Sequence, residues 1–311
     1  MNYRAFLSLF NIFLLLACSP TEKAIQLTWQ PLDSINVDLP HGITVHHAIH
    51  TGENLRAWYV RVEEKRQDIE TRVEVSTDID GRETISEFAQ RLGVPVMVNG
   101  GYFRMDLNPA RHVGILRVND SLIHAATTSV LRGEQRFYMH RSAIGFDEGD
   151  QIGIEWVSST GDSVFFWDRA IDNKPGLPGA MVDTTFRALW EFRDILGGGP
   201  LLVKDGKVFV PVNEEVFFGT RIPDIHPRTA AGITSSGDLI LLIVDGRQMI
   251  SRGVDLMELA TIMQDLGCQN AINLDGGGSS SLVVNGHLLN RPAGKTEERQ
   301  VMSAIAVYAI P

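Results

Sequence analysis

Alternating apolar and polar positions give the first sign of structure near the start of the chain. Residues 43–49 and 55–62 are rich in β-branched and aromatic side chains and alternate in part, which is typical of half-buried strands. The sequence Thr-Gly-Glu-Asn between them suits a hairpin loop. Residues 72–75 form a third candidate strand. These patterns predict a β-hairpin followed by another strand.

A helical period first appears over residues 85–92, where Thr84 is placed to cap the first turn and Gly93 to end the helix. The run 94–98 that follows is short and apolar, as expected for a buried strand that ends at Asn99. A short helix and a buried strand are therefore expected in succession.

Weaker patterns mark the middle of the chain, residues 110–193. Strands are expected at 114–118, 142–146 and 152–157, and residues 173–179 form a loop rich in proline and glycine. No internal repeat or low-complexity tract interrupts this region, so it offers no domain boundary.

The second half carries clearer signals. Residues 239–244 are all apolar and are bounded by Gly-Asp and Asp-Gly, which predicts a fully buried strand. Apolar residues recur at helical spacing over 256–266, and strands are expected at 271–274 and 304–310. Since strands outnumber helices, the sequence predicts an α+β fold, as a single domain with a large mixed or antiparallel sheet and few helices.

The first seventeen residues have the features of an export signal, with one early arginine and an apolar run too short to span a membrane comfortably. This run ends in Leu-Leu-Ala-Cys18, which resembles the lipobox of bacterial lipoproteins; the alternative is an ordinary secretory signal with a chance cysteine. The resemblance implies cleavage before Cys18 and a lipid anchor in the cell envelope, on the outer membrane or the outer face of the cell membrane. Residues 1–17 are then the signal, 18–40 a tether and 41–311 the domain.

Charge and cysteine content narrow the classes of partner. Without its signal the chain has a net charge of −11, which argues against nucleic acid or an anionic lipid surface as the main partner. If Cys18 carries lipid, Cys268 has no partner for a disulfide, and it is expected to be a small core residue. No clustered Cys/His motif typical of zinc is present.

Three segments, 98–103, 195–203 and 273–284, share one design, in which an apolar strand leads into a glycine cluster. Such clusters suggest bare backbone that faces a ligand, with N–H groups arranged to bind an anion. The first two clusters are equally well explained as a hairpin turn and as a bulge at a crowded sheet crossing. The third cluster adds Asp275 and three serines, so a functional role is favoured there.

Two arginines are candidates for anion binding. Arg228 lies in a His-Pro-Arg segment that precedes a strand, and Arg247 follows the strand 239–244. A guanidinium can hold a phosphate through two parallel hydrogen bonds, although a lone arginine is more often a solvated surface residue.

Taken in order, these motifs resemble the phosphodiester glycosidase family. The matching segments are Asn99-Gly100-Gly101-Tyr102-Phe103, Gly197 to Val203, Arg228-Thr229-Ala230, Val244 to Arg247, Glu258-Leu259-Ala260 and Asn273 to Ser280. The resemblance covers roughly Val94 to Val307 and implies a hydrolase that cleaves a sugar from a phosphodiester. Many relatives have Phe in place of Tyr102, and Thr is also common at Ser281. Residues 117–193 match no motif and are the expected substrate-specific part.

The resemblance and the chemistry together suggest a set of site residues. Asp275 is the first candidate for the base or nucleophile, Asp245 is the second carboxylate, and Glu258 is a capping residue first and a catalytic acid second. His226 is a proton-donor candidate, with loop shaping as the alternative. The expected substrate contacts are Asn99, Gly100, Gly101, Arg228, Thr229, Arg247, Gly276, Gly277, Gly278, Ser279 and Ser280.

A second hypothesis is a non-catalytic glycan-binding or exopolysaccharide-assembly lipoprotein. The aromatic residues Trp156, Phe165, Phe166, Trp167 and Trp190 would then stack on sugars, although large aromatics more often belong to the core. No cofactor is predicted, although calcium held by Asp275, Asp245 and Asn273 is an open alternative whose spacing matches no known loop. The sequence carries no indication of the oligomeric state.

Overall fold

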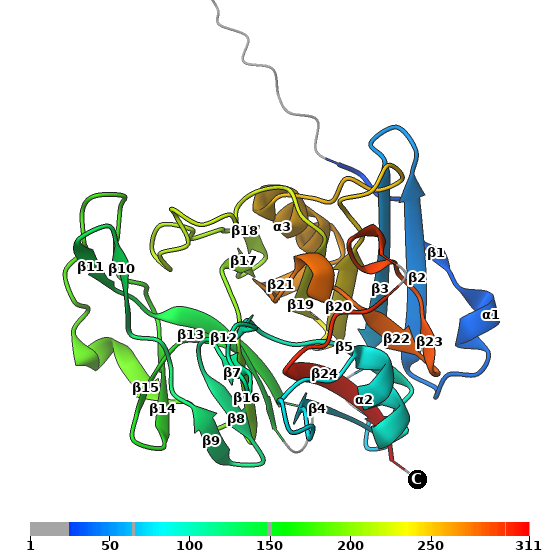
Figure 1. The fold of residues 1–311 in the computed structure, drawn as a ribbon, viewed down its shortest axis with the longest axis horizontal. Coiled ribbons are helices and arrows are strands. Elements are labelled where there is room, and N and C mark those ends of the chain that lie inside the picture. Colours follow the sequence, from blue (N-terminus) through cyan, green and yellow to red (C-terminus); the bar gives the residue numbers. More distant parts are fainter. Residues whose placement is uncertain (1–24, 64–65, 148–150, 296, 311) are drawn as a thin grey trace, which may run out of the picture.

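A computed structural model describes residues 25–63, 66–147, 151–295 and 297–310. Strands dominate it, and every strand pair in the described part is antiparallel, so the predicted α+β class with few helices is confirmed. The strands divide into three larger sheets and two short ribbons (Figure 1). The β-structure is therefore shared among several sheets.

The first sheet has eight strands in the order β1-β2-β3-β20-β19-β21-β17-β18. Its members are β1 (Gln30–Pro31), β2 (Ile43–His50), β3 (Leu55–Val62), β17 (Leu201–Lys204), β18 (Lys207–Val208), β19 (Arg228–Thr234), β20 (Leu239–Val244) and β21 (Cys268–Asn273). The predicted hairpin is confirmed as β2 and β3, and all six apolar residues of β20 are buried, as their unbroken run predicts.

The second sheet has seven strands in the order β15-β14-β13-β12-β16-β8-β9 and contains most of the middle of the chain. Its members are β8 (Leu116–Val118), β9 (Ser121–His124), β12 (Arg141–Asp147), β13 (Gln151–Thr160), β14 (Ser163–Trp167), β15 (Arg187–Leu189) and β16 (Asp194–Gly197). The three strands predicted there are confirmed, and β14 and β15 are additional strands that the sequence patterns do not reveal.

The third sheet has five strands in the order β23-β22-β5-β24-β4. Its members are β4 (Ile69–Val75), β5 (Val96–Asn99), β22 (Leu282–Val284), β23 (His287–Leu288) and β24 (Ser303–Ala309). Two ribbons pair β6 (Phe103–Arg104) with β7 (Arg111–His112) and β10 (Ser129–Arg132) with β11 (Gln135–Tyr138). The helices are α1 (Asp33–Asn36), α2 (Ile85–Leu92), α3 (Leu256–Asp265) and the 3₁₀ turns η1 (Thr184–Phe186), η2 (Gly277–Ser279) and η3 (Pro292–Gly294).

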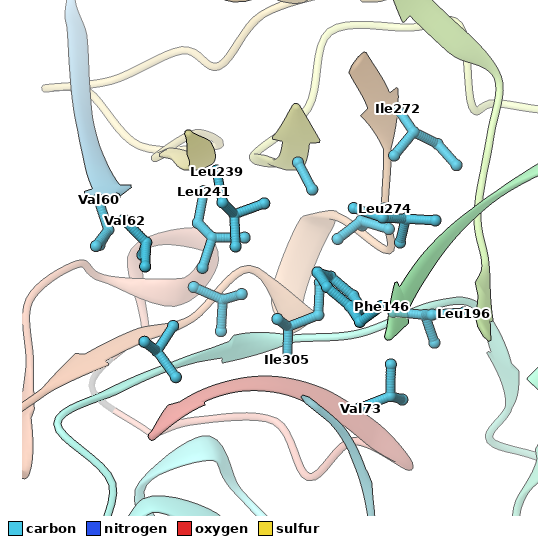
Figure 2. Close-up of a cluster of buried hydrophobic side chains, with 14 of the residues drawn as sticks. Val60, Val62, Val73, Phe146, Leu196, Leu239, Leu241, Ile272, Leu274 and Ile305 are labelled. Atoms are coloured by element: carbon cyan, nitrogen blue, oxygen red, sulfur yellow. The ribbon is translucent and has the colours of Figure 1, made fainter. Parts of the chain in front are cut away.

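One apolar core joins the three sheets. Figure 2 shows side chains of the first sheet, such as Leu241, lying with Ile305 of the third sheet and Phe146 of the second. A separate cluster lies under α3 on the other face of the first sheet and includes Leu259, Met263 and the buried Cys268. The first sheet is thus covered on both faces, which explains why its central strands are continuously apolar.

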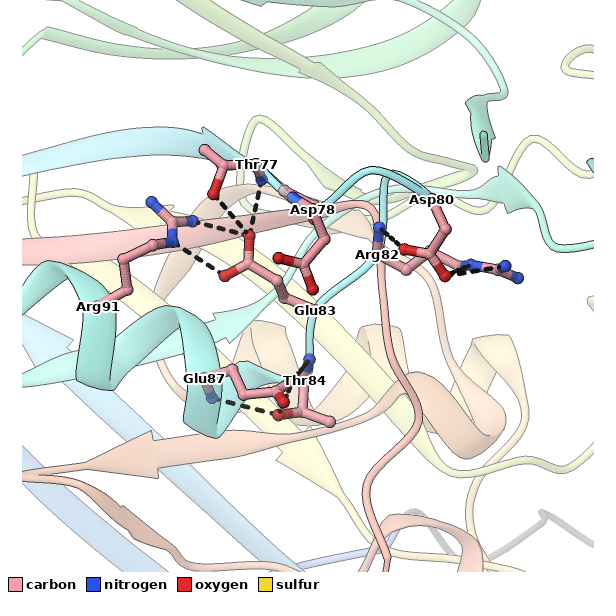
Figure 3. Close-up of polar contacts among 9 residues, drawn as sticks. Thr77, Asp78, Asp80, Arg82, Glu83, Thr84, Glu87 and Arg91 are labelled. Carbon is pink, nitrogen blue, oxygen red and sulfur yellow. Dashed lines mark hydrogen bonds and ion pairs between the residues drawn. The ribbon is translucent and has the colours of Figure 1, made fainter. Parts of the chain in front are cut away.

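Local sequence signals account for the ends of α2. Thr84 accepts a hydrogen bond from the Glu87 backbone N–H (3.2 Å), Glu87 accepts one in return from the Thr84 N–H (2.7 Å), and Gly93 ends the helix with a left-handed backbone (Figure 3). Arg91, in the last turn, binds the buried Glu83 at 2.9 Å. The predicted helix, its cap and its stop are confirmed.

The described part of the predicted tether packs on the domain instead. Ile25 is buried in the cluster under α3, and β1 pairs with β2 at residues 46–47. The scarcity of apolar residues in 18–40 suggested a tether, but the few that are present dock on the first sheet, so the described residues 25–40 belong to the domain. Residues 1–17 and Cys18 lie outside the described residues.

Candidate active site

Three neighbouring strands of the first sheet bring distant parts of the sequence to one edge. β19 begins at Arg228, and its antiparallel pairing places Arg228 opposite Val244, the last residue of β20. On the other side of β19, Ala230 pairs with Asn273, the last residue of β21. The segments that follow β20 and β21 therefore meet the segment that precedes β19.

A pocket of about 200 Å³ opens at this edge. The described residues that line it are Tyr102, Arg221, Ile222, His226, Arg228, Arg247, Asp275, Gly276, Gly277 and Arg299. Among them are four arginines and a single carboxylic acid, which gives the pocket a positive potential. Such a lining favours an anionic ligand whose reacting atom lies near the carboxylate of Asp275.

Three of the four arginines, Arg228, Arg247 and Arg299, form no ion pair with a carboxylate among the described residues. Arg228 is only 2% exposed, and its guanidinium donates from Nε to the carbonyl of Val254 (3.0 Å) and from Nη2 to that of Ile222 (2.8 Å). Burial lowers the pKa of Arg247, and the charge of Arg299 lowers it further. Because a guanidinium removed from water without a counter-ion is costly, the buried Arg228 favours an anion in the pocket, and Arg247 and Arg299 add positive charge beside it.

Asp275 is the one carboxylic acid among the described lining residues, and its loop fixes its position. Its backbone N–H donates to the Gly100 carbonyl (3.1 Å), and the Gly276 N–H donates to its Oδ1 (3.0 Å). Burial raises the pKa of Asp275 to about 6, although Ser279, Arg299 and the Gly276 N–H act in the opposite direction. Asp275 is therefore ionised above about pH 6 and is able to act as a base or nucleophile.

His226 orients one of the arginines. Its Nε2 lies 2.7 Å from the Arg221 carbonyl oxygen, which can only accept, so Nε2 carries the proton. Its Nδ1 then accepts from Nη2 of Arg247 at 3.1 Å. Burial lowers the pKa of His226, and Arg228 and Arg247 reinforce this effect. A neutral imidazole with both nitrogens engaged positions Arg247, which favours the loop-shaping alternative over proton donation.

Tyr102 forms another wall of the pocket. Its hydroxyl donates to the Gly199 carbonyl (2.8 Å) and accepts from Nδ2 of Asn273 (2.6 Å). Burial raises the pKa of Tyr102, and the nearby Asp275 raises it further. The hydroxyl is therefore neutral and bonded to the backbone, and it ties the glycine cluster of residues 197–199 to the end of β21.

The glycines after Asp275 make room for arginines. A Cβ on Gly278 would lie 2.5 Å from Nη2 of Arg299, and one on Gly277, where φ is +67°, would lie 3.2 Å from the Arg247 guanidinium. A Cβ on Gly276 would lie 2.8 Å from the Pro227 carbonyl oxygen. The bare backbone of this loop is a surface on which two guanidinium groups lie, and only Gly276 and Gly277 of the three line the pocket themselves.

The backbone N–H groups predicted to bind an anion in this loop mostly form hydrogen bonds within the protein. The Gly276 N–H is bonded to Asp275, the Gly277 N–H donates to the Pro227 carbonyl (2.9 Å), and the Ser279 N–H donates to the Gly276 carbonyl (3.2 Å). These donors stabilise the turn η2 and are unavailable to a ligand. We therefore assign anion binding to the arginine side chains instead of the backbone of this loop.

Comparison with known proteins identifies the family. A profile of the phosphodiester glycosidase family matches residues 92–308. The chain belongs to this family. It is 26% identical over 242 residues to N-acetylglucosamine-1-phosphodiester α-N-acetylglucosaminidase of Bos taurus, an alignment that covers 73% of this chain and 39% of the relative. The human counterpart is also 26% identical, with 73% of this chain and 40% of the relative covered, so the chain spans about two fifths of these relatives.

Solved structures show the same phosphodiester glycosidase fold. The catalytic domain of the zebrafish N-acetylglucosamine-1-phosphodiester α-N-acetylglucosaminidase, auto-inhibited by its pro-peptide, matches with a TM-score of 0.60 at 20% identity and covers 91% of this chain and 88% of that chain. A hypothetical protein from Synechocystis matches with a TM-score of 0.60 at 19% identity, covering 91% of this chain and 68% of that one. At these identities the likeness concerns the fold.

Asn99 lies behind the pocket of this family member and does not line it. It is fully buried, its Nδ2 donates to the Asp275 carbonyl (2.6 Å), and its Oδ1 accepts from the Thr229 hydroxyl (2.7 Å) and the Ser281 N–H (3.2 Å). A side chain satisfied in this way has no group left for a sugar. We replace the predicted substrate contacts of Asn99 and Thr229 with a bracing role for the Asp275 loop.

Gly100 and Gly101 are also structural. A Cβ on Gly100 would lie 2.4 Å from the Ser303 hydroxyl, and one on Gly101 would lie 2.2 Å from the Gly197 carbonyl oxygen. The bare backbone here faces other backbone and not the pocket, which corrects the predicted substrate contact. A Cβ on Gly198 would likewise lie 2.7 Å from a backbone oxygen, which supports the crowded-crossing interpretation of the second glycine cluster.

Asp245 does not line the pocket either. It is 1% exposed, and its Oδ1 accepts from Nδ2 of Asn290 and from the Arg291 N–H, both at 3.1 Å. Burial raises its pKa to about 6. The structure thus separates Asp245 from the lining residues and gives it the role of holding the segment that follows β23.

Glu258 occupies the third position of α3, where it completes a capping box with Asp255. It also binds Arg252 with oxygen–nitrogen distances of 2.7 and 2.9 Å. Burial acts to raise the pKa of Glu258, but the bond to Arg252, the Asp255 N–H and the charges of Arg252 and Arg228 together outweigh it, and the pKa is lowered. The contacts of Glu258 are those of a helix-capping residue, and Glu258 does not line the pocket.

The predicted serines and Gly278 support the pocket from behind. Ser280 is buried with its hydroxyl 3.2 Å from the Thr229 hydroxyl, whereas Ser279 bonds to Asp275 and lies 3.5 Å from Nη1 of Arg299. Neither serine lines the pocket. Of the predicted substrate contacts, the structure brings Arg228, Arg247, Gly276 and Gly277 to the pocket itself.

The described residues contain no group of three or more His, Cys, Asp or Glu side chains arranged to hold a metal ion. In the same part of the chain, the helices are all too short or too polar to cross a bilayer. Calcium and the lipid anchor therefore stay predictions from the sequence.

Sequence reasoning missed Arg221, Ile222 and Arg299, and it quoted Tyr102 within a motif without giving it a place in the site. Arg299 lies in the polar run Lys-Thr-Glu-Glu-Arg, which has the composition of a solvated surface loop. Its proximity to Asp275 arises from the pairing of β24 with β5, which joins residues about two hundred positions apart. No local pattern carries that information.

Proposed function

We propose that this chain is a cell-envelope hydrolase that cleaves the glycosidic bond of a sugar-1-phosphodiester. The observation that carries the proposal is the meeting, in one pocket, of Asp275 with Arg228, Arg247 and Arg299, none of which has a carboxylate partner among the described residues. Membership of the phosphodiester glycosidase family supports the same reaction.

The arginines suit the charge of the substrate. A phosphodiester carries one negative charge, and this charge grows on the phosphate as the sugar–oxygen bond breaks. Guanidinium groups already fixed by Val254, Ile222 and His226 require little reorganisation to stabilise that growing charge. We assign phosphate binding to Arg228 and Arg247, with Arg299 beside Asp275.

A single carboxylate suits this leaving group. Most glycosidases use two carboxyl groups, because an alkoxide leaves only when an acid protonates it. A phosphate monoester leaves as a stable anion, so the pocket needs a base or nucleophile and has little need for an acid. In the overall reaction water adds to the anomeric carbon, the bond from that carbon to the phosphate oxygen breaks, and the bonding pair leaves with the phosphate. Asp275 either takes the proton of the attacking water or attacks the carbon directly.

Cellular location rests on the N-terminal sequence. We propose that the chain is exported, cut before Cys18 and anchored through lipid on that cysteine, which supports a substrate among envelope glycans or glycoconjugates. Replacing Cys18 with Ser should abolish membrane retention, and normal membrane fractionation of a correctly processed Cys18→Ser protein would contradict the anchor.

A direct test uses a methyl ester of N-acetylglucosamine-1-phosphate, with the sugar taken from the names of the mammalian relatives. Wild-type protein should release the sugar, and Asp275→Asn should lower turnover by at least about a hundredfold, the scale for loss of a general base or nucleophile. Asp245→Asn is the matched control, because it removes a buried carboxylate with the same pKa of about 6 that does not line the pocket. Wild-type turnover in Asp275→Asn would exclude the catalytic role.

The non-catalytic alternative gains no specific support from the aromatic residues. Trp156, Trp167 and Trp190 are buried, as expected for core residues, whereas Phe165 and Phe166 are partly exposed but do not line the pocket. Binding of the ester by wild type without any release of sugar would nevertheless favour that alternative over hydrolysis.

A further inference from the structure

The turn after β20 has an unusual tip. Gln248 and Ser251 exchange two backbone hydrogen bonds of 3.1 Å, so Met249 and Ile250 form the tip of a two-residue turn. Met249 is 93% exposed and Ile250 40% exposed. Turn tips of this size usually carry Asn, Asp or Gly. These residues adopt the backbone angles of a tight turn readily, and Asn and Asp are also well solvated. Met249 therefore gains little from packing within this chain, and Ile250 leaves part of its apolar surface in water.

This tip lies outside the pocket lining but directly follows it in sequence. The residue that precedes the turn is Arg247, which lines the pocket and is held by His226. The neighbouring loop presents another apolar side chain, Ile225, which is 47% exposed and lies next to His226. Both loops that flank the arginines therefore offer apolar side chains to the surroundings.

The same side of the molecule receives the N-terminal segment. The Arg252 N–H donates to the Asn54 carbonyl (2.8 Å), which joins the turn to the β2–β3 hairpin. Ile25, where the described chain begins, belongs to the same apolar cluster as Leu55 at the start of β3. Six residues lie between Cys18 and Ile25, and the seven Cα–Cα steps of a fully extended chain span at most roughly 25 Å. A lipid on Cys18 would therefore hold this side of the molecule close to a membrane.

We propose that Met249 and Ile250 contact the membrane and present the pocket to a sugar-1-phosphodiester whose second alcohol is a lipid. This inference rests on the proposed function and narrows its substrate class. Apolar side chains at the rim receive the lipid chain, while the arginines bind the phosphate at the membrane surface. The negative net charge of the chain disfavours contact through anionic headgroups, so the contact depends on these apolar side chains.

A comparison of two substrates tests the substrate class. The lipidated full-length protein is assayed on the dodecyl ester of N-acetylglucosamine-1-phosphate in phosphatidylcholine vesicles and on the soluble methyl ester. Met249→Ser/Ile250→Ser should lower kcat/KM on the dodecyl ester by at least about tenfold and leave the methyl ester unchanged, because only the first reaction uses apolar contact. Ile79→Ser is the matched control, since Ile79 is 99% exposed but lies between β4 and α2, in a different segment from the turn 248–251, and it should change neither rate.

Equal effects of the double substitution on both esters, or no effect on either, would overturn the inference. Absence of sugar release from both esters in the wild type would count against the proposed hydrolysis, so membrane contact is also measured without catalysis. An environment-sensitive dye on Met249→Cys should be quenched by nitroxide-labelled phosphatidylcholine in the vesicles, whereas the same dye on Ile79→Cys should not. Cys268 is buried and does not compete for the dye. Equal quenching at both positions, or none at position 249, would exclude the membrane contact.

Discussion

Replacing Asp275 with Asn should make the protein more stable at pH 8 while it removes activity. The pKa of Asp275 is about 6 in the folded chain, against 3.8 for an ordinary Asp. Each pKa unit corresponds to about 1.4 kcal/mol, so at pH 8 the ionised carboxylate costs the folded state up to about 3 kcal/mol. This figure is an upper bound, because Asp275 is partly exposed to the water of the pocket.

The sign of the effect depends on pH in a defined way. Below the unfolded pKa of 3.8, Asp275 is protonated in both states and the wild type suffers no cost. Between 3.8 and about 6 the unfolded chain ionises first, so the wild type loses stability relative to Asp275→Asn as the pH rises. Above about 6 the difference is constant. The gain from Asp275→Asn should therefore be full at pH 8 and absent near pH 3.5.

Urea unfolding of wild type, Asp275→Asn and Asp245→Asn at both pH values measures this difference in the free energy of unfolding. The comparison requires that the dependence of that free energy on urea concentration is the same in all three proteins. Asp245 has the same raised pKa of about 6, so Asp245→Asn should show a pH-dependent gain of the same sign but keep its turnover. A gain in Asp275→Asn that persists at low pH would show that packing and not charge is responsible. No gain at pH 8 would refute the raised pKa of Asp275.

Further predictions concern the groups around Asp275. Arg299→Gln should raise KM and move the acid limb of kcat/KM to higher pH, because the positive charge of Arg299 lowers the pKa of Asp275; an unmoved limb would separate the two groups. Gly278→Ala should displace the Arg299 guanidinium, which a Cβ would approach to 2.5 Å, and so reproduce the KM change of Arg299→Gln; wild-type kinetics would show that Arg299 has no fixed place. Arg228→Lys should lower the melting temperature as well as the turnover, since Arg228 also donates to the carbonyls of Val254 and Ile222; full activity would remove Arg228 from the site. Activity should survive treatment with a chelator, because arginines meet the phosphate charge; loss restored by calcium would revive the calcium alternative.

The sequence predicts well wherever the signal is local. The capping residues of α2 and the unbroken apolar run of β20 define those elements, because their causes lie within a few residues. Arg228 and Asp275 were found because strand ends and glycine clusters are visible in the sequence. Each of these features depends on near neighbours.

Roles that depend on distant pairing were not predictable in the same way. Asn99 has the composition and position of a substrate contact, yet Thr229 and Ser281, brought in by other strands, use all of its oxygen capacity. Asp245 follows a strand as Asp275 does, but Asn290 covers it. Whether a polar residue at a strand end faces the pocket or supports it depends on which loop covers it, and that is a property of the whole fold.

The close contact between the glycine loop and two guanidinium groups restricts how this pocket can diversify in evolution. Side chains cannot be added at Gly277 or Gly278 without moving an arginine, so this wall is closed to variation that preserves anion binding. The exposed side chains of Ile225, Met249 and Ile250 lie next in sequence to pocket residues and carry no such constraint. New substrate preferences in descendants of this chain should therefore arise by substitution at those three positions, and a library restricted to them should recover altered specificity while phosphate recognition is inherited unchanged.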